Sequence, residues 1–251
     1  MKKKLLAFGF ATFILLIAAC KKEQTVTEVS TSPTATVQLN FTNFIDGQAV
    51  ALGLLNYSNA ASNKYSVSLL KYYISNVELI SKTGTVFKAN NVSLIDAGSS
   101  SQNVLTMKNV PAGEYINAKF NLGIDSARNH TGVQDGYLDP SYGMIWSWNT
   151  GYIFFKHEGQ FINSSKQTMP LRLHLGTDKA LTPVIVPINL SINGNARKIE
   201  LRFNLNKAYT NPATIDFNTD NDRQSTAAAD ETWIAGMKNN LNSSFNILII
   251  E

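Results

Sequence analysis

The side chains of this sequence best suited to bind a metal ion are those of its three histidines and of a pair of tryptophans. The histidines most favourably placed are His174 and His130, and the tryptophans are Trp146 and Trp148. Neutral imidazole is a ligand for several transition metals. The only cysteine, Cys20, lies in the N-terminal leader rather than in the fold. A metal site in the folded domain must therefore use histidine, carboxylate, methionine or a more unusual ligand.

Other residues of this stretch occupy alternate positions of an extended chain. Met144 and the two tryptophans would share one face of a strand, which makes this methionine a candidate soft donor or, equally, a core residue. The two tryptophans are open to the same core interpretation. His157 would lie on the opposite face, and we interpret it as incidental to a site. Lys156 and Glu158 would lie on the tryptophan face, where we expect a salt bridge or strand-end hydrogen bonds rather than acid–base chemistry.

No catalytic motif accompanies these residues. The chain lacks G-x-S-x-G, H-E-x-x-H and a phosphate-binding loop, and its acidic residues form no pair at one predicted strand end. The segment 216–222 has oxygen donors at alternate positions, but a calcium loop would need Gly in place of Asn221 and Glu in place of Ala227. We expect a solvated loop there, with Ca²⁺ binding left open, and no enzymatic activity.

The N-terminus has the features of a secretory signal. Three lysines precede the apolar segment Leu5–Ala19, whose fifteen residues are fewer than the roughly 20 needed to span a bilayer. The segment Ile17–Cys20 resembles a bacterial lipobox, in which the cysteine is lipidated and becomes the mature N-terminus. We predict a signal peptide at 1–19 and a lipid-anchored flexible linker at 20–36. The protein would be anchored to a membrane of the bacterial cell envelope, on its periplasmic or cell-surface face.

Removal of the signal peptide changes the charge balance. It takes away three of the 22 Lys and Arg residues and none of the 18 Asp and Glu residues, which leaves a formal charge of +1. The high sequence pI therefore comes partly from the leader. The main argument for a nucleic-acid partner, a strongly basic chain, therefore no longer holds.

Residues 37–251 read as a single domain made mainly of β-strands. Val37, Leu39 and Phe41 alternate with polar residues, and similar short runs separated by turn signals continue along the chain. Only the segment Ala227–Leu241 has helical spacing of its apolar residues. We predict an antiparallel β-sandwich, immunoglobulin-like or similar, with one short helix in the C-terminal region.

The segment Ile188–Leu205 carries the clearest turn signal. Two runs with alternating apolar residues flank Asn193 and Gly194. Asn-Gly between two such runs favours a type I′ turn. The pattern predicts an antiparallel hairpin in which Ile199, Leu201 and Phe203 are buried.

The motifs around the tryptophans resemble the methanobactin-associated MbnP family of copper-binding proteins. Residues 144–159 contain M-x-W-x-W, then G-Y-I and K-x-E-G, residues 171–176 end in H-L-G, and residues 65–79 contain Y-Y-I-S-N-V. The resemblance implies an extracytoplasmic copper protein. In the better understood relatives, two histidines and a tryptophan oxidised to kynurenine surround the copper, and a dihaem peroxidase-like partner is thought to carry out the oxidation.

Carried over to this sequence, the resemblance implies His174 as one copper ligand and Trp146 or Trp148 as the modified residue, with Trp146 preferred. His130 is the candidate second histidine, or a polar loop residue, because the family's usual context after it is replaced by Thr-Gly. A type 1 blue-copper site is excluded because its cysteine thiolate is missing. Either Cu(I) or Cu(II) is compatible with imidazole ligands.

Three functions remain compatible with the sequence. The leading one is a copper-binding lipoprotein for capture, storage or delivery of the metal. The others are a metal-free binding or adhesion module, in which the tryptophan motif is core, and a hydrolase without an identified nucleophile. The first predicts that His174 and at least one of Trp146 and Trp148 line one pocket, with His130 at its rim.

Overall fold

The computed structural model describes residues 33–99, 103–147, 151–225 and 230–251. The predicted signal peptide, Cys20 and Trp148 lie outside the described residues. The first strand begins at Thr34, before the predicted start of the domain at Val37. No helix of the described part is long and apolar enough to cross a membrane.

One sheet has five strands built around β1 (Thr34–Ile45). Along one edge, β1 pairs in parallel with β13 (Arg197–Asn204), which in turn pairs with β15 (Phe245–Ile250). Along its other edge, β1 pairs antiparallel with β7 (Val104–Pro111) and then β2 (Gln48–Ala49). The β1–β13 pair is thus a parallel pair in a largely antiparallel sheet.

The second sheet divides at β5 (Leu69–Ser81). One edge of β5 pairs with β6 (Val86–Asp96). Along the other edge, the first residues of β5 pair with β10 (Gly151–Ile162) and the later ones with β8 (Gly113–Leu122), which continues to β12 (Thr182–Ile192). Two arms of the sheet therefore leave the same strand.

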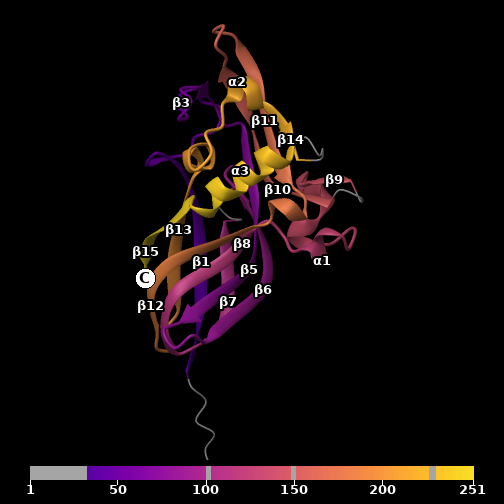
Figure 1. Cartoon of the computed structure of the whole chain (residues 1–251). Helices are drawn as coiled ribbons and strands as arrows, with labels where there is room; N and C mark the ends of the chain where they lie inside the picture. The colour runs from indigo at the N-terminus through magenta and orange to yellow at the C-terminus, as the bar shows by residue number, and fades with distance from the viewer. Residues whose placement is uncertain (1–32, 100–102, 148–150, 226–229) are drawn as a thin grey trace, which may run out of the picture. The chain divides into compact units, whose positions relative to one another are not determined.

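The β10 arm carries the sequence motifs of interest. It continues through β11 (Thr168–Gly176) to β14 (Asp222–Gln224), and Figure 1 shows these three strands side by side. β9 (Ile145–Ser147) pairs with the start of β10. Two short strands complete the sheet, β3 (Tyr57–Ser58) and β4 (Lys64–Tyr65).

Aromatic side chains from the two sheets meet in the core. Phe41 of β1 lies 5.8 Å from Phe120 of β8, measured between ring centroids, and Tyr72 of β5 lies 4.9 Å from Phe203 of β13. Phe245 of β15 contacts the same group, 5.1 Å from Phe120. Because these rings come from both sheets, the two sheets pack face to face. The predicted β-sandwich is confirmed.

The predicted hairpin between β12 and β13 is wrong. β12 pairs with β8, whereas β13 pairs with β1 and β15, so the chain crosses from one sheet to the other between them. The inward residues Ile199, Leu201 and Phe203 are fully buried, as predicted, and Gly194 has a φ of 103°. Alternation identifies the buried face of a strand but not its partner, so a connection between sheets has the same pattern as a hairpin.

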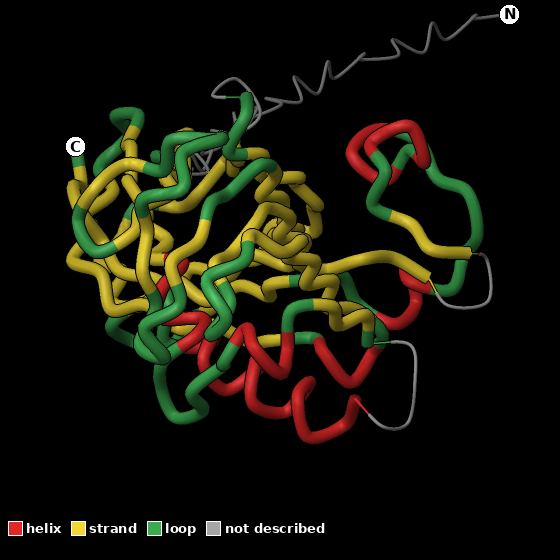
Figure 2. Tube along the Cα trace, turned by 90° about the horizontal axis from the view of Figure 1, so that it is seen from above, coloured by secondary structure: helices red, strands yellow, loops and turns green. Residues whose placement is uncertain are grey.

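The predicted C-terminal helix is present as α3 (Glu231–Asn242). Its buried face contains Trp233, Met237 and Leu241, and it packs against β12. Figure 2 shows the longest run of helix along one side of the strands. The remaining helices are short: α1 (Ser126–Asn129), η2 (Gly136–Leu138), η3 (Pro140–Tyr142), η4 (Asp178–Ala180), η5 (Leu205–Tyr209) and α2 (Phe217–Asp220).

The acidic segment 216–222 has structural partners for its carboxylates. Asp216 caps α2 by accepting a hydrogen bond from the Asn218 amide. Asp220 pairs with Arg223, and Asp222 pairs with Arg172 at 2.6 Å. The segment therefore forms a helical turn and the first residue of β14, with its carboxylates in capping and ion-pair contacts, rather than the solvated loop predicted.

Candidate metal site

The tryptophan motif spans two antiparallel strands rather than one. β9 pairs with β10 through Ser147 and Gly151, so the chain reverses between them. The expectation that Trp146 and His157 alternate along one strand is therefore wrong. After β10 ends at Ile162, β11 returns antiparallel along it. Figure 1 shows β9 beside β10.

Trp146 packs over the end of β11. A Cβ atom placed on Gly176 would lie 2.6 Å from Cζ3 of Trp146, so the indole occupies the space that any larger residue would need. His174 and Gly176 share a face of β11 and are separated by about 7 Å of extended chain. The structure thus brings Trp146 and His174 to neighbouring positions on one face.

His174 is held by a carboxylate from the adjacent strand. Its Nε2 lies 2.8 Å from Oε1 of Glu158, and Nζ of Lys156 lies 3.5 Å from the same oxygen. Lys156 is the direct pairing partner of His174 across β10 and β11. The predicted salt bridge between Lys156 and Glu158 is present, and it includes His174 as a third member.

The other ring nitrogen of His174 is buried without a hydrogen-bond partner among the described residues. The imidazole is 6% exposed, and burial lowers its pKa, although the hydrogen bond to Glu158 opposes this effect. The ring is therefore neutral at pH 7. Burial alone would raise the pKa of Glu158, but its contacts with His174 and Lys156 lower it overall, so the carboxylate is ionised.

Because an ionised carboxylate only accepts hydrogen bonds, the proton of the neutral His174 ring must be on Nε2. The lone pair of Nδ1 is then free. A buried acceptor without a partner costs about 1–3 kcal/mol. A metal ion bound at Nδ1 would remove that cost, and metal-bound histidines commonly donate their other N–H to a carboxylate. His174 thus fits a metal ligand.

His130 belongs to a separate polar cluster. It follows α1, and its Nε2 lies 3.1 Å from Oδ2 of Asp178. Asn129 donates to the other oxygen of Asp178 at 2.8 Å and accepts from the Tyr152 amide at 2.8 Å, which ties this cluster to the start of β10. The His130 side chain is half exposed. Its Nε2 is also held by a carboxylate, as in His174.

The remaining candidates are buried in the core. Met144 is 1% exposed and belongs to the hydrophobic core. His157 is fully buried, with Nδ1 2.6 Å from the Tyr209 hydroxyl and Nε2 3.3 Å from the Ser66 carbonyl oxygen. Burial lowers its pKa to about 4. Both of its nitrogens are used, in agreement with the interpretation of His157 as incidental.

The two histidine–carboxylate pairs stay separate. Among the described residues, no group of three or more His, Cys, Asp or Glu side chains is close enough to hold a metal ion. Trp146 packs at Gly176, two residues from His174, whereas His130 lies with Asp178. Trp148, the other tryptophan of the motif, is outside the described residues.

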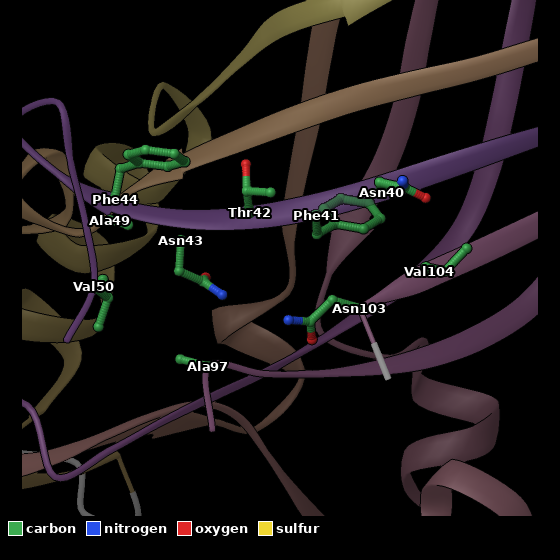
Figure 3. A pocket seen from close by; sticks show the side chains of 10 residues that line it. All are labelled: Asn40, Phe41, Thr42, Asn43, Phe44, Ala49, Val50, Ala97, Asn103 and Val104. Carbon is green, nitrogen blue, oxygen red and sulfur yellow. The ribbon is translucent and has the colours of Figure 1, made fainter. Parts of the chain in front are cut away.

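One groove borders this site, and a separate pocket contains none of its residues. A groove of about 650 Å³ has Glu158, Arg172 and Asp222 in its wall and so reaches the partner of His174. A second pocket, of about 310 Å³, is lined by β1, β2, Ala97 and the start of β7 (Figure 3). Figure 3 shows the amides of Asn43 and Asn103 turned toward each other, and no charged or sulfur-containing side chain lines this pocket.

Sequence reasoning missed three residues that build the site. Ser225 donates its amide to the His174 carbonyl at 3.1 Å and its hydroxyl accepts from the Gly176 amide at 2.7 Å. Asp178 holds His130, and Gly176 admits the Trp146 ring. For Gly176 a signal was present, because the H-L-G motif ends at this residue. Its glycine leaves the space that the Trp146 indole fills. Ser225 and Asp178 had none, because only tertiary contacts select them.

The fold and the site together define a mainly β sandwich protein with a tryptophan on β9, a carboxylate on β10 and a buried histidine on β11. A family model named MbnP matches residues 34–230, and the chain belongs to the MbnP family. The fold is also similar to the solved structure of MbnP from Methylosinus trichosporium, with a TM-score of 0.53 and 16% identity over 78% of this chain and 83% of that chain. Among curated proteins, the search finds no match.

Proposed function

We propose that this protein is a copper-binding lipoprotein of the bacterial cell envelope, which captures, stores or delivers the metal at His174. Membership of the MbnP family supports copper as the metal. The observation that carries the proposal is the buried Nδ1 of His174, which has no hydrogen-bond partner among the described residues. The proposal assigns no catalytic reaction to the chain.

The neighbourhood of Trp146 supports a role for this tryptophan in the same site. Its ring lies over Gly176, and its Nε1 is likewise buried without a hydrogen-bond partner in the described part of the chain. Oxidation to kynurenine by O₂ or by two molecules of H₂O₂ would cleave the C2–C3 bond of the indole and leave a ketone at C3. Hydrolysis then releases C2 as formate and leaves an aromatic amine. We propose Trp146 as the oxidised residue and a dihaem peroxidase-like protein as the maturation partner. His130, Trp148 and Met144 are the further candidate donors.

Copper content measured on single variants tests the proposal. The apo protein is loaded with Cu(I) and, separately, Cu(II), freed of excess metal, and analysed by elemental mass spectrometry. We expect His174→Ala to weaken binding by more than about 100-fold, the upper end of what loss of an outer-shell partner costs. Arg172→Ala is the matched control, because Arg172 lies on the same face of β11 and pairs with Asp222.

His130→Ala separates the two-histidine site from a site at His174 alone. An equal loss in both histidine variants assigns both as ligands. If wild type and His174→Ala bind equal amounts of copper, the proposal is wrong. The function favoured instead would be the metal-free binding module, for which the packing of Trp146 on Gly176 provides structural support.

A further inference from the structure

The backbone of Glu158 is fixed in position by close contacts with a neighbouring segment. Its carbonyl accepts the Ser68 amide at 2.7 Å, and a Cβ atom on Gly159 would lie 2.0 Å from the Ser66 carbonyl oxygen. The strand can approach Ser66 so closely only because residue 159 is glycine. The backbone of Glu158 is therefore anchored at the point from which its side chain reaches β11.

The side chain of Glu158 is oriented from two directions. Lys156 lies 3.5 Å from Oε1, and Nε2 of His174 lies 2.8 Å from the same atom. Lys156 also donates to the carbonyl of Gly143 at 3.0 Å, in the segment that leads into β9. The lysine thus connects the carboxylate to the segment that carries Trp146.

We propose that Glu158 is a positioning residue that holds His174 as the Nε2–H tautomer and so presents Nδ1 to copper. The inference deepens the proposed function and rests on it for the identity of the metal. Glu158 accepts a hydrogen bond from Nε2–H of the His174 ring, which leaves the lone pair on Nδ1. The buried, unpartnered Nδ1 is the atom that this arrangement leaves available for coordination.

The tautomer is measured first, in the apo protein. Long-range ¹H–¹⁵N correlation spectra at neutral pH distinguish protonated from unprotonated ring nitrogens. We expect wild-type His174 to carry its proton on Nε2. In Glu158→Leu, which keeps the bulk but removes the acceptor, we expect a mixture of the two tautomers. In Glu158→Gln, the amide oxygen beside Lys156 still accepts, so the wild-type tautomer should be restored.

A matched control is provided by Glu78, in the later half of β5, where this strand pairs with β8. It pairs with Lys88 at 3.0 Å and Lys119 at 3.4 Å and, like Glu158, belongs to an outward-facing ion-paired group. Glu78→Leu should leave the His174 spectrum unchanged. A wild-type ring protonated on Nδ1, or an unchanged tautomer in Glu158→Leu, would overturn the inference. If Glu158→Leu fails to fold, the wild-type and Glu158→Gln spectra still decide it.

Copper binding is measured second. We expect the Kd for copper to rise about 10- to 100-fold in Glu158→Leu, as for other outer-shell partners, and to rise less in Glu158→Gln. An unchanged Kd in Glu158→Leu would contradict a positioning role. If wild type has the Nε2–H tautomer but binds no copper, the copper function fails, whereas the selection of the tautomer by Glu158 stands.

Discussion

His157 and His174 come from adjacent strands and differ in what their ring nitrogens contact. His157 uses both nitrogens, on Tyr209 and Ser66, within the core between the sheets. His174 uses one, on Glu158, and faces the other side of the sheet. Burial disfavours the charged form of both rings. Of these two rings, that of His174 retains a nitrogen that can bind an additional group.

The buried state of His157 predicts a pH dependence of stability. Its pKa is about 4 in the folded protein and has the ordinary value of 6.5 in the unfolded chain, so the unfolded state binds more protons between these values. Its contribution is therefore complete above pH 6.5 and is lost as the pH falls toward 4. The loss is on the order of 3 kcal/mol.

Urea unfolding at pH values from 7 to 4 measures this effect. His157→Gln is the comparison, because glutamine can retain hydrogen bonds to Tyr209 and Ser66 without titrating. The difference in unfolding free energy between wild type and variant should shrink or change sign as the pH falls. Parallel pH profiles for the two proteins would show that His157 does not cause the dependence.

At the scale of elements, the site depends on how β9, β10 and β11 are stacked. β11 returns antiparallel along β10, which places His174 opposite Lys156. β9 folds back on the start of β10, which places Trp146 over Gly176. β14 then pairs in parallel with β11 and is followed by Ser225, whose contacts hold the backbone at His174.

The contact between Trp146 and Gly176 predicts a large effect of a single methyl group. In Gly176→Ala, the added Cβ would lie 2.6 Å from the indole and 2.5 Å from the Tyr152 carbonyl oxygen. We expect destabilisation by about 1–3 kcal/mol, as for other overpacked sites. Thermal unfolding measures it, and tryptophan fluorescence should shift as the indole is displaced.

A double-variant cycle identifies the source of this cost. Gly176→Ala should be less destabilising in a Trp146→Ala background, because the clash with the ring is absent while the clash with Tyr152 remains. Equal costs in the two backgrounds would show that the indole does not pack on Gly176.

At the scale of the whole molecule, the chain combines a folded sandwich with an N-terminal segment outside the described residues. β1 begins at Thr34, and the predicted lipidation site is Cys20. β1 is a central strand of its sheet, paired on both edges, so the residues that follow the predicted linker are tied directly into the core. We propose that the linker connects this core to a lipid anchor.

The anchor is tested by Cys20→Ser. We expect the variant to remain uncleaved or to be released from the membrane fraction, and its N-terminal peptide to lack the acyl mass that the wild type carries. Fractionation with intact-mass analysis measures both properties. Unchanged partitioning together with an unchanged mass would contradict the lipid anchor.

Local patterns in the sequence were sufficient for several features of the fold. Alternation located the buried faces of β1 and β13, and helical spacing located the buried face of α3. The motifs around Trp146 and His174 indicated the MbnP family, to which the chain belongs. These features depend on residues a few positions apart, because the period of the apolar residues in the sequence sets which face of an element is buried.

Tertiary structure alone decided which of these elements meet. The segment around Asn193 crosses between the two sheets instead of forming a hairpin, and His130 lies with Asp178. The pairing of His174 with Glu158 depends on the register between β10 and β11. Strand partners and register are chosen by packing of both sheets at once, and residues far apart in sequence contribute equally to that choice. For this reason the candidate ligand was predictable from the sequence, whereas its free nitrogen was not.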